Sequence, residues 1–315
     1  MNLGDIDLAL ALGGLVAGLM VGLTGMGGAA LVTPMLVLLF GIPPAAAVSS
    51  DVFAAAVMKP VGAAVHMRNK TVHWGLVGWL SLGSIPGVLI GTLIFANVLA
   101  TSGADETIRT WIGVVLIIAL CAMLLKTYLT ARSGKLHCEQ ELLGTAMPVQ
   151  IVPTVALGLV IGLIVGMTSV GSGSLMVTVL LLIYPLLRPS VLVGTDLTQA
   201  VPMLIAGAIA HAGLGNIDIA VVVSLLIGQL PGVYFGARLS ARYDGRRLRY
   251  LLMVVLAATA IKLLGAPSVV AGTIAIVGVL VIGTMMLRER VRSTSSCEPL
   301  SSPSPEALNA SCGKK

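Results

Sequence analysis

Apolar residues occur in long uninterrupted runs, and polar residues are confined to short connecting segments. Runs of about 20 apolar residues are typical of membrane-spanning helices, because a helix of that length crosses the hydrocarbon core. The pattern predicts two series of segments, in each of which a long first segment precedes one too short to cross a bilayer comfortably. The first series comprises residues 6–23, 29–42, 44–66, 74–99 and 109–130, the second comprises 151–168, 174–187, 190–212, 217–239 and 247–264, and a further span covers 269–287.

The composition also indicates a membrane protein. Of 315 residues, 57% are hydrophobic and only 10% are charged, whereas soluble domains carry about 25% charged residues. The net charge of +6 does not indicate a nucleic-acid partner, because the basic residues lie in short loops and tails, as the positive-inside rule requires. The four cysteines contain no Cys-x-x-Cys pair, so we expect no disulfide framework, no metal site and no cofactor.

The two series align with each other almost residue for residue. Asp51 corresponds to Asp196 and His66 corresponds to His211, both at an offset of 145 residues (196 − 51 and 211 − 66). Several matched residues at one common offset are hard to obtain by chance, so the sequence indicates that the chain arose by an internal duplication. The same offset relates Ile85-Pro86-Gly87 to Leu230-Pro231-Gly232 and Gly91 to Gly236.

Loop charges predict that the two halves are inverted relative to each other. The loop after His66 carries Arg68 and Lys70, whereas the loop after His211 carries only Asp218. Cytoplasmic loops are rich in basic residues, so these matched loops should face opposite sides of the membrane. We therefore expect an all-α polytopic membrane protein built from two inverted-topology repeats, with the N-terminus outside and the C-terminus cytoplasmic. The expected parts are a first repeat at 1–130, a cytoplasmic linker at 131–150, a second repeat plus one extra helix at 151–292, and a disordered cytoplasmic tail at 293–315.

Each half contains a glycine-rich stretch between its long first segment and its short second segment. The first reads Gly22-Leu23-Thr24-Gly25-Met26-Gly27-Gly28, and the second reads Gly166-Met167-Thr168-Ser169-Val170-Gly171-Ser172. Small residues and hydroxyls at such a place predict a helix that breaks near the bilayer midplane. A break is tolerated in lipid only where it is buried in protein or lines a cavity. Inverted repeats with broken helices are an architecture of transporters, in which the site lies at the repeat interface.

Over about residues 8–287 the chain resembles the sulfite exporter TauE/SafE family of membrane transport proteins. The resemblance rests on the doubled glycine-rich breaks, on the Asp at the head of a later helix, and on two His-containing elements, Val65-His66-Met67-Arg68-Asn69-Lys70 and Ala210-His211-Ala212-Gly213-Leu214-Gly215. A Pro-Gly-x-x-x-Gly helix follows in both halves. The first half departs from the pattern at His73-Trp74, where an Asp is expected.

The resemblance implies a bacterial inner-membrane protein that moves sulfur-containing anions such as sulfite and sulfonates. We expect a secondary transporter, with export as the favoured direction and alternating access as its mechanism. An anion channel or a transporter of an unrelated small organic anion is the alternative. The sequence has no ATP-binding motif and no clustered nucleophile–base pair or metal ligands, so a primary pump is disfavoured and an enzyme is not expected.

The glycine-rich breaks are the predicted substrate site. A broken helix offers free backbone N–H groups and the positive end of its dipole, which together suit an anion. The alternative is that the small residues only permit close helix packing. The candidate substrate-binding residues are Thr24, Gly25, Gly27, Gly28, Thr168, Ser169, Gly171 and Ser172, together with Lys59 and Gln199.

Ionisable residues inside apolar segments are costly and usually face a cavity or a partner. Lys59 has the apolar Leu204 as its counterpart, and it can either neutralise an anionic substrate or pair with a carboxylate, for which Asp196 is the better candidate than Asp51. The two Asp residues are expected either to bind a proton coupled to transport or to cap a helix N-terminus.

His66 and His211 end matched helices and are candidates for pH-responsive gates, although anchoring at the membrane interface is the favoured interpretation. The expected partners are a small anionic substrate and the lipid bilayer, and no nucleic acid. Proton coupling and homo-oligomerisation are left open by the sequence.

Overall fold

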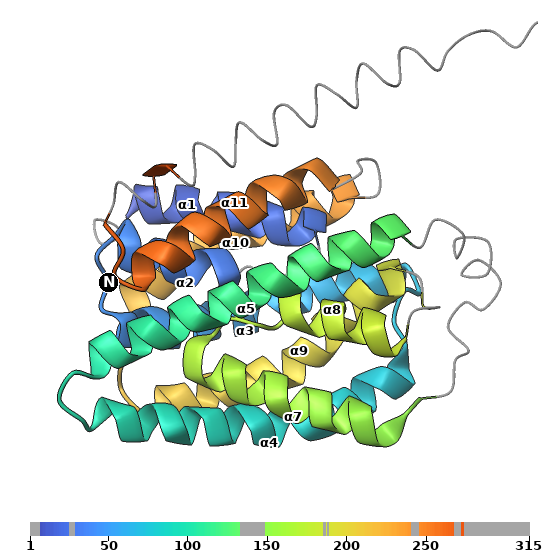
Figure 1. The fold of residues 1–315 in the computed structure, drawn as a ribbon, viewed down its shortest axis with the longest axis horizontal. Coiled ribbons are helices and arrows are strands. Elements are labelled where there is room, and N and C mark those ends of the chain that lie inside the picture. The colour runs from blue at the N-terminus through green and yellow to red at the C-terminus, as the bar shows by residue number, and fades with distance from the viewer. Residues whose placement is uncertain are drawn as a thin grey trace, which may run out of the picture. The chain divides into compact units, whose positions relative to one another are not determined.

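The computed structural model describes residues 7–24, 29–132, 149–184, 187, 189–240, 246–267 and 272–273. They belong to one compact unit, Met1–Ala275, and Ile276–Lys315 form a second unit. Most of the predicted span 269–287, most of the linker and the whole predicted tail therefore lie outside the described residues. Within the described ranges, all regular secondary structure is helical (Figure 1). The helices are α1 (Leu8–Thr24), α2 (Ala29–Leu38), α3 (Pro44–Arg68), α4 (Trp74–Leu99), α5 (Ala104–Arg132), α7 (Ile151–Thr168), α8 (Ser174–Ile183), α9 (Pro189–Ala212), α10 (Ile219–Ser240) and α11 (Arg246–Leu263).

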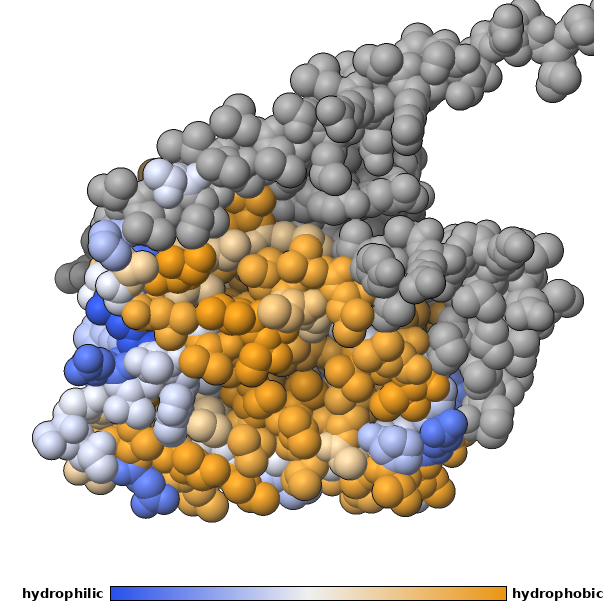
Figure 2. Space-filling view, in the orientation of Figure 1, coloured by the Kyte–Doolittle hydropathy of each residue, from blue (hydrophilic) through white to orange (hydrophobic). Residues whose placement is uncertain are grey.

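The prediction of a polytopic helical membrane protein is confirmed. Six of the described helices are long and apolar enough to cross a membrane: they lie within α3, α4, α5, α7, α9 and α10. Helices α2 and α8 have only 10 residues each, which at 1.5 Å per residue is about 15 Å, half of a hydrocarbon core. Figure 2 shows apolar side chains covering the middle of one face, with polar side chains gathered toward its ends.

Each half begins with a helical hairpin. In the first half, α2 returns along α1, since a Cβ at Gly13 would lie 2.7 Å from the sulfur of Met35. In the second half, α8 returns along α7. Tyr184, directly after α8, hydrogen-bonds through its hydroxyl to the Thr154 hydroxyl (2.7 Å) and accepts from the Gln150 backbone N–H (2.8 Å), both near the start of α7. In the second half the turn between α7 and α8 is the predicted glycine-rich stretch, and residues 25–28 of the corresponding stretch in the first half lie outside the described residues.

Helices of opposite halves pack backbone to backbone in a reciprocal way. Helix α4 of the first half lies along α7 of the second, and α10 of the second half lies along α1 of the first. A Cβ at Gly87 would lie 2.3 Å from the carbonyl oxygen of Leu159, and one at Gly232 would lie 2.5 Å from that of Leu15. Only glycine permits this approach, which lets membrane helices gain van der Waals contact that lipid cannot replace. Glycines at every fourth position line these contacts: Gly83, Gly87 and Gly91 with Gly158, Gly162 and Gly166, and Gly228, Gly232 and Gly236 with Gly14 and Gly18.

The two central helices, α3 and α9, cross in opposite directions. Ser49, near the start of α3, contacts His211 near the end of α9, whereas a Cβ at Gly62 would contact Leu197 near the start of α9. The paired helices at the periphery instead run parallel, because Gly83 faces Val155 and Gly91 faces Leu163. Helices α3 and α9, which correspond at the offset of 145 residues, therefore point in opposite directions.

Charged residues separate between the two ends of the bundle. Arg68 and Lys70 are exposed in the turn before α4, and Asp105 and Glu106 are exposed after it, at the other end of this helix (Figure 1). Because α3 and α9 are antiparallel, the turn that holds Asp218 lies at the end opposite to Arg68. The opposite loop charges noted in the sequence thus correspond to opposite ends of the fold.

Candidate functional site

Lys59 and Asp51 carry charge from α3 into the interface between the halves. Each is only 1% exposed. The ammonium of Lys59 donates a hydrogen bond of 2.6 Å to the hydroxyl of Ser172. Asp51 accepts through Oδ2 from the hydroxyls of Thr33 (2.6 Å) and Ser169 (2.9 Å). Both charged residues of the first half therefore bind the glycine-rich turn of the second half.

That turn has the backbone geometry of a helix break. Ser169 closes α7 in the left-handed conformation with φ 60°, and Gly171 and Gly173 have φ 123° and 113°. Such angles are strained for residues with a side chain, so glycine is required at 171 and 173. Helix α8 begins directly afterwards at Ser174. Its first backbone N–H groups have no partners within the helix, and its dipole places partial positive charge beside the turn.

One hydroxyl predicted to bind substrate, that of Thr168, is already engaged in hydrogen bonds within the second half. The hydroxyl of Thr168 donates to the Ile164 carbonyl (2.8 Å) and accepts from the Val170 N–H (3.3 Å), so Thr168 shapes the turn. In the first half, Gly25, Gly27 and Gly28 and the side chain of Thr24 lie outside the described residues.

Helix α9 contributes Asp196 and Gln199, both 0% exposed. Asp196 and Asp51 both interact electrostatically with Lys59. The amide oxygen of Gln199 accepts from the Ser84 hydroxyl (3.2 Å), while its amide nitrogen has no hydrogen-bond partner among the described residues. The buried lysine of α3 thus contacts the second glycine-rich turn through Ser172, and α9 places a carboxylate and an amide in the buried interior.

Helix capping is the wrong interpretation for the two aspartates. Helix α3 begins at Pro44 and α9 begins at Pro189. Asp51 and Asp196 therefore lie two turns inside their helices, where all backbone N–H groups have intrahelical partners. Proline at the first helical position, rather than Asp, starts both helices.

Interface anchoring is the wrong interpretation for His211, which is 0% exposed. Its Nε2 lies 3.0 Å from the Gly166 carbonyl and its Nδ1 lies 3.0 Å from the Ser49 hydroxyl. A carbonyl only accepts, so Nε2 carries the proton and Ser49 donates to Nδ1 in the neutral ring. His66 is only partly buried and lies 3.0 Å from the hydroxyl of its neighbour Thr71. The second half has Gly194 where the first half has Ser49, which explains why the two histidines bond differently.

The departure of the first half at His73 has a structural explanation. His73 caps α4 by accepting the Leu76 N–H at Nδ1 (3.1 Å), and Asp218 caps α10 by accepting the Val221 N–H (3.2 Å). The two caps occupy equivalent positions. Each cap residue also donates its own N–H to the other half, to Thr195 (3.0 Å) from His73 and to Ser50 (3.0 Å) from Asp218. The sequence shows that both hydroxyls directly precede the matched aspartates, but it does not reveal that each accepts from a cap residue of the other half.

Replacing His73 by Asn is expected to leave the stability of the protein within about 0.5 kcal/mol of the wild type, because Asn caps helices as well as Asp does. His73→Ala is expected to cost about 1 kcal/mol, since it leaves the Leu76 N–H without its acceptor. Thermal unfolding in detergent measures both. Equal losses for Asn and Ala would show that the imidazole has a function other than capping.

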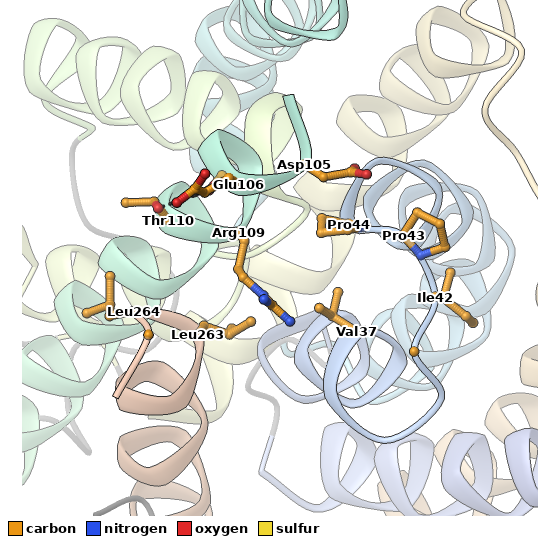
Figure 3. A pocket seen from close by; sticks show the side chains of 12 residues that line it. Val37, Ile42, Pro43, Pro44, Asp105, Glu106, Arg109, Thr110, Leu263 and Leu264 are labelled. Atoms are coloured by element: carbon orange, nitrogen blue, oxygen red, sulfur yellow. Dashed lines mark hydrogen bonds between the residues drawn. The ribbon is translucent and has the colours of Figure 1, made fainter. Parts of the chain in front are cut away.

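A separate cavity of about 520 Å³ lies at the end of the bundle that carries the acidic turns. It is bounded by the turn between α2 and α3, the start of α5 and the end of α11. Figure 3 shows the guanidinium of Arg109 extending between Leu263 and Val37, with Asp105 and Glu106 pointing away from it. No pattern in the sequence predicted this cavity. No group of three or more metal-ligating side chains occurs in the part of the chain that the structure describes.

Comparisons with known proteins point to a family of membrane transporters. Residues 10–263 match the family model described as "Sulfite exporter TauE/SafE". Three proteins of Bacillus subtilis (strain 168) are similar to the chain. "Probable membrane transporter protein YjnA" is 34% identical over 82% of this chain and 100% of its own length. YdhB and YunE, which carry the same description, are 28% and 25% identical over 70% and 80% of this chain and 85% and 93% of their own lengths. No solved structure matches the chain significantly.

Proposed function

The chain belongs to the sulfite exporter TauE/SafE family of membrane transporters, and from this premise we propose that it carries small sulfur-containing anions, such as sulfite or sulfonates, by alternating access. The observation that carries the proposal is the buried ammonium of Lys59 against Ser172 in the second glycine-rich turn. A lysine is placed in the middle of a membrane protein at high cost, and such residues mark substrate pathways.

The anion site would form around Lys59. Helix α3 extends nine residues beyond Lys59 (68 − 59), so the Cα of Lys59 lies about 14 Å from that end of the helix. The N-terminus of α8 adds backbone donors, and Ser172 and the amide nitrogen of Gln199 add side-chain donors. An oxyanion that displaced Ser172 from Lys59 would accept charge-assisted hydrogen bonds, which are the strong ones in a low-dielectric site.

Two kinds of contact between the halves support alternating access. The glycine contacts of α4 with α7 and of α1 with α10 are close-packed backbone contacts, which suit rigid units that move as a whole. The crossing of α3 and α9 is polar, and its hydrogen bonds can exchange partners. We propose that the two halves are inverted repeats, and the antiparallel course of α3 and α9 supports this. Binding of the anion at the crossing would bias the movement of one unit against the other.

The proposed orientation places the turn after α3 in the cytoplasm and the turn after α9 outside. In a variant whose native cysteines are replaced by Ser, Asn69→Cys and Asn216→Cys report these two turns. A membrane-impermeant maleimide added to intact cells is expected to label position 216, and to label position 69 only after permeabilisation. Labelling of both positions from the same side would contradict the inverted arrangement.

Flux measurements test the function itself. Purified protein in proteoliposomes is expected to move labelled sulfite and methanesulfonate at rates that saturate with concentration, and protein-free liposomes serve as the control. Saturation distinguishes a carrier from an anion channel, whose flux continues to rise. Absence of flux for both anions, from a preparation that gives one sharp thermal transition, would contradict the proposal.

A further inference from the structure

The cavity beside Arg109 is lined by charged groups that do not pair with one another. On α5, Arg109 follows Glu106 by three residues and Asp105 by four, which are the spacings at which opposite charges on a helix normally meet. Figure 3 shows both carboxylates pointing away from the guanidinium. Among the described residues, the guanidinium has no hydrogen-bond or ion-pair partner. Its N–H donors are therefore available to a ligand.

The guanidinium extends across the apolar floor of the cavity. It lies between Val37 and Leu263 (Figure 3), which are only 5% and 2% exposed, whereas an arginine near a membrane boundary ordinarily directs its charged head toward water. The wall formed by the end of α11 packs closely on α5, because a Cβ at Gly113 would lie 2.9 Å from Cγ of Leu264. The volume of about 520 Å³ is within the range of small-molecule sites, about 300–1,000 Å³.

The start of α3 adds partial positive charge to the same cavity. Pro43 and Pro44 line it, and α3 begins at Pro44 without a side-chain cap. The dipole of this long helix therefore places its positive end at the cavity wall. An oxyanion held by the fork of Arg109 donors would be favoured by both groups, and phosphate matches this fork in a bidentate way.

The two carboxylates lie nearer the end of the bundle than Arg109 does. Helix α5 starts at Ala104, and at 1.5 Å per residue the Cα of Arg109 lies about 6 Å further along the helix than that of Asp105. The cavity therefore fits a ligand with an oxyanion at an inner position and an ammonium at an outer position. In the headgroup of phosphatidylethanolamine, the phosphate is next to the glycerol and the ammonium lies beyond it, toward water.

We propose that this cavity binds the headgroup of phosphatidylethanolamine from the adjacent leaflet, with the phosphate on Arg109 and the ammonium beside Asp105 and Glu106. A lipid is the matching source because the cavity lies at helix ends, and Leu264 on its rim is 42% exposed and can contact the glycerol. The inference goes beyond the function proposed above and does not depend on it. A headgroup there would contact α3 and α5 of the first half and α11 of the second, and would hold the two halves together.

Thermal unfolding in dodecyl maltoside with added dioleoyl phospholipids tests the proposal. Phosphatidylethanolamine is expected to raise the Tm by about 3 °C or more above the value in phosphatidylglycerol or phosphatidylcholine. Phosphatidylglycerol has the phosphate without an ammonium, and the quaternary ammonium of phosphatidylcholine has no N–H donors. Equal shifts for the three lipids, or no shift with phosphatidylethanolamine, would overturn the proposal. The full shift from free phosphoethanolamine would assign the cavity to a soluble zwitterion and would overturn the lipid assignment.

Two variants test the residues. Arg109→Gln is expected to raise the phosphatidylethanolamine concentration at the half-maximal shift by about tenfold or more, because it removes charge-assisted hydrogen bonds to the phosphate. Asp105→Asn/Glu106→Gln should abolish the preference for phosphatidylethanolamine over phosphatidylglycerol. The matched control is Arg68→Gln, since Arg68 is exposed at the opposite end of the bundle, and it should respond as the wild type does. A selective shift that persists in Arg109→Gln, or an equal loss in Arg68→Gln, would overturn the proposal.

Discussion

Replacing Lys59 by Met is expected to lower the kcat/KM for methanesulfonate transport by about 30-fold or more. Breaking a buried charge-assisted contact costs 2–5 kcal/mol, and each 1.4 kcal/mol is tenfold in affinity. The substitution also leaves Asp51 and Asp196 without their cation, so we expect the free energy of unfolding to fall by about 3–5 kcal/mol. Flux in proteoliposomes and denaturation in detergent measure the two effects.

A second variant separates substrate contact from a structural pair. In Lys59→Met/Asp196→Asn, one positive and one negative charge are removed together, so the stability should recover most of its loss. Transport should stay abolished, because the anion still lacks its ammonium. The matched control is Lys262→Met, since this lysine is exposed near the end of α11 and should transport normally. Recovery of transport in the double variant would assign Lys59 a purely structural function.

Gly87→Ala is expected to destabilise the protein by about 3 kcal/mol or more, because a Cβ would meet the Leu159 carbonyl oxygen at 2.3 Å and the backbones of α4 and α7 must separate. Gly232→Ala, the equivalent change between α10 and α1, should cost a similar amount, and the two losses should add because the sites are distant. Thermal unfolding in detergent measures the losses.

Gly78 provides the control on the same helix. A Cβ there has no atom within 4 Å, so Gly78→Ala should leave stability unchanged or raise it by up to about 1 kcal/mol through helix propensity. If Gly78→Ala and Gly87→Ala behave alike, the close contacts between the halves do not hold the fold together.

The helices were predictable because their signals are local. Long apolar runs, Pro at helix starts and the repeat offset place most helix boundaries within a few residues. The short helices α2 and α8 also follow from the interruptions after the glycine-rich stretches. The reciprocal packing of α1 with α10 and of α4 with α7 was not predicted. Glycine spacing marks a close contact but does not identify the partner helix.

The site was predictable in its composition and not in its contacts. Lys59 stood out because the residue at the equivalent position of the second half, Leu204, is apolar. Its hydrogen bond to Ser172 depends on how the two halves pack together, which the sequence does not show. His211 looked like an interface residue because it ends an apolar segment. Its burial follows from Phe95 and Ser49 of the other half, whose approach no local pattern reveals. The cavity beside Arg109 is formed by three segments that are far apart in sequence.

The central claim is that the anion binds at the crossing of α3 and α9, beside Lys59. A crystal of the protein grown with selenite, a sulfite analogue whose selenium scatters anomalously, locates the site directly. We expect the selenium peak beside Lys59 and the Ser172 turn, with a selenite oxygen about 3 Å from the ammonium. A peak in the cavity beside Arg109 and none beside Lys59 would contradict the account.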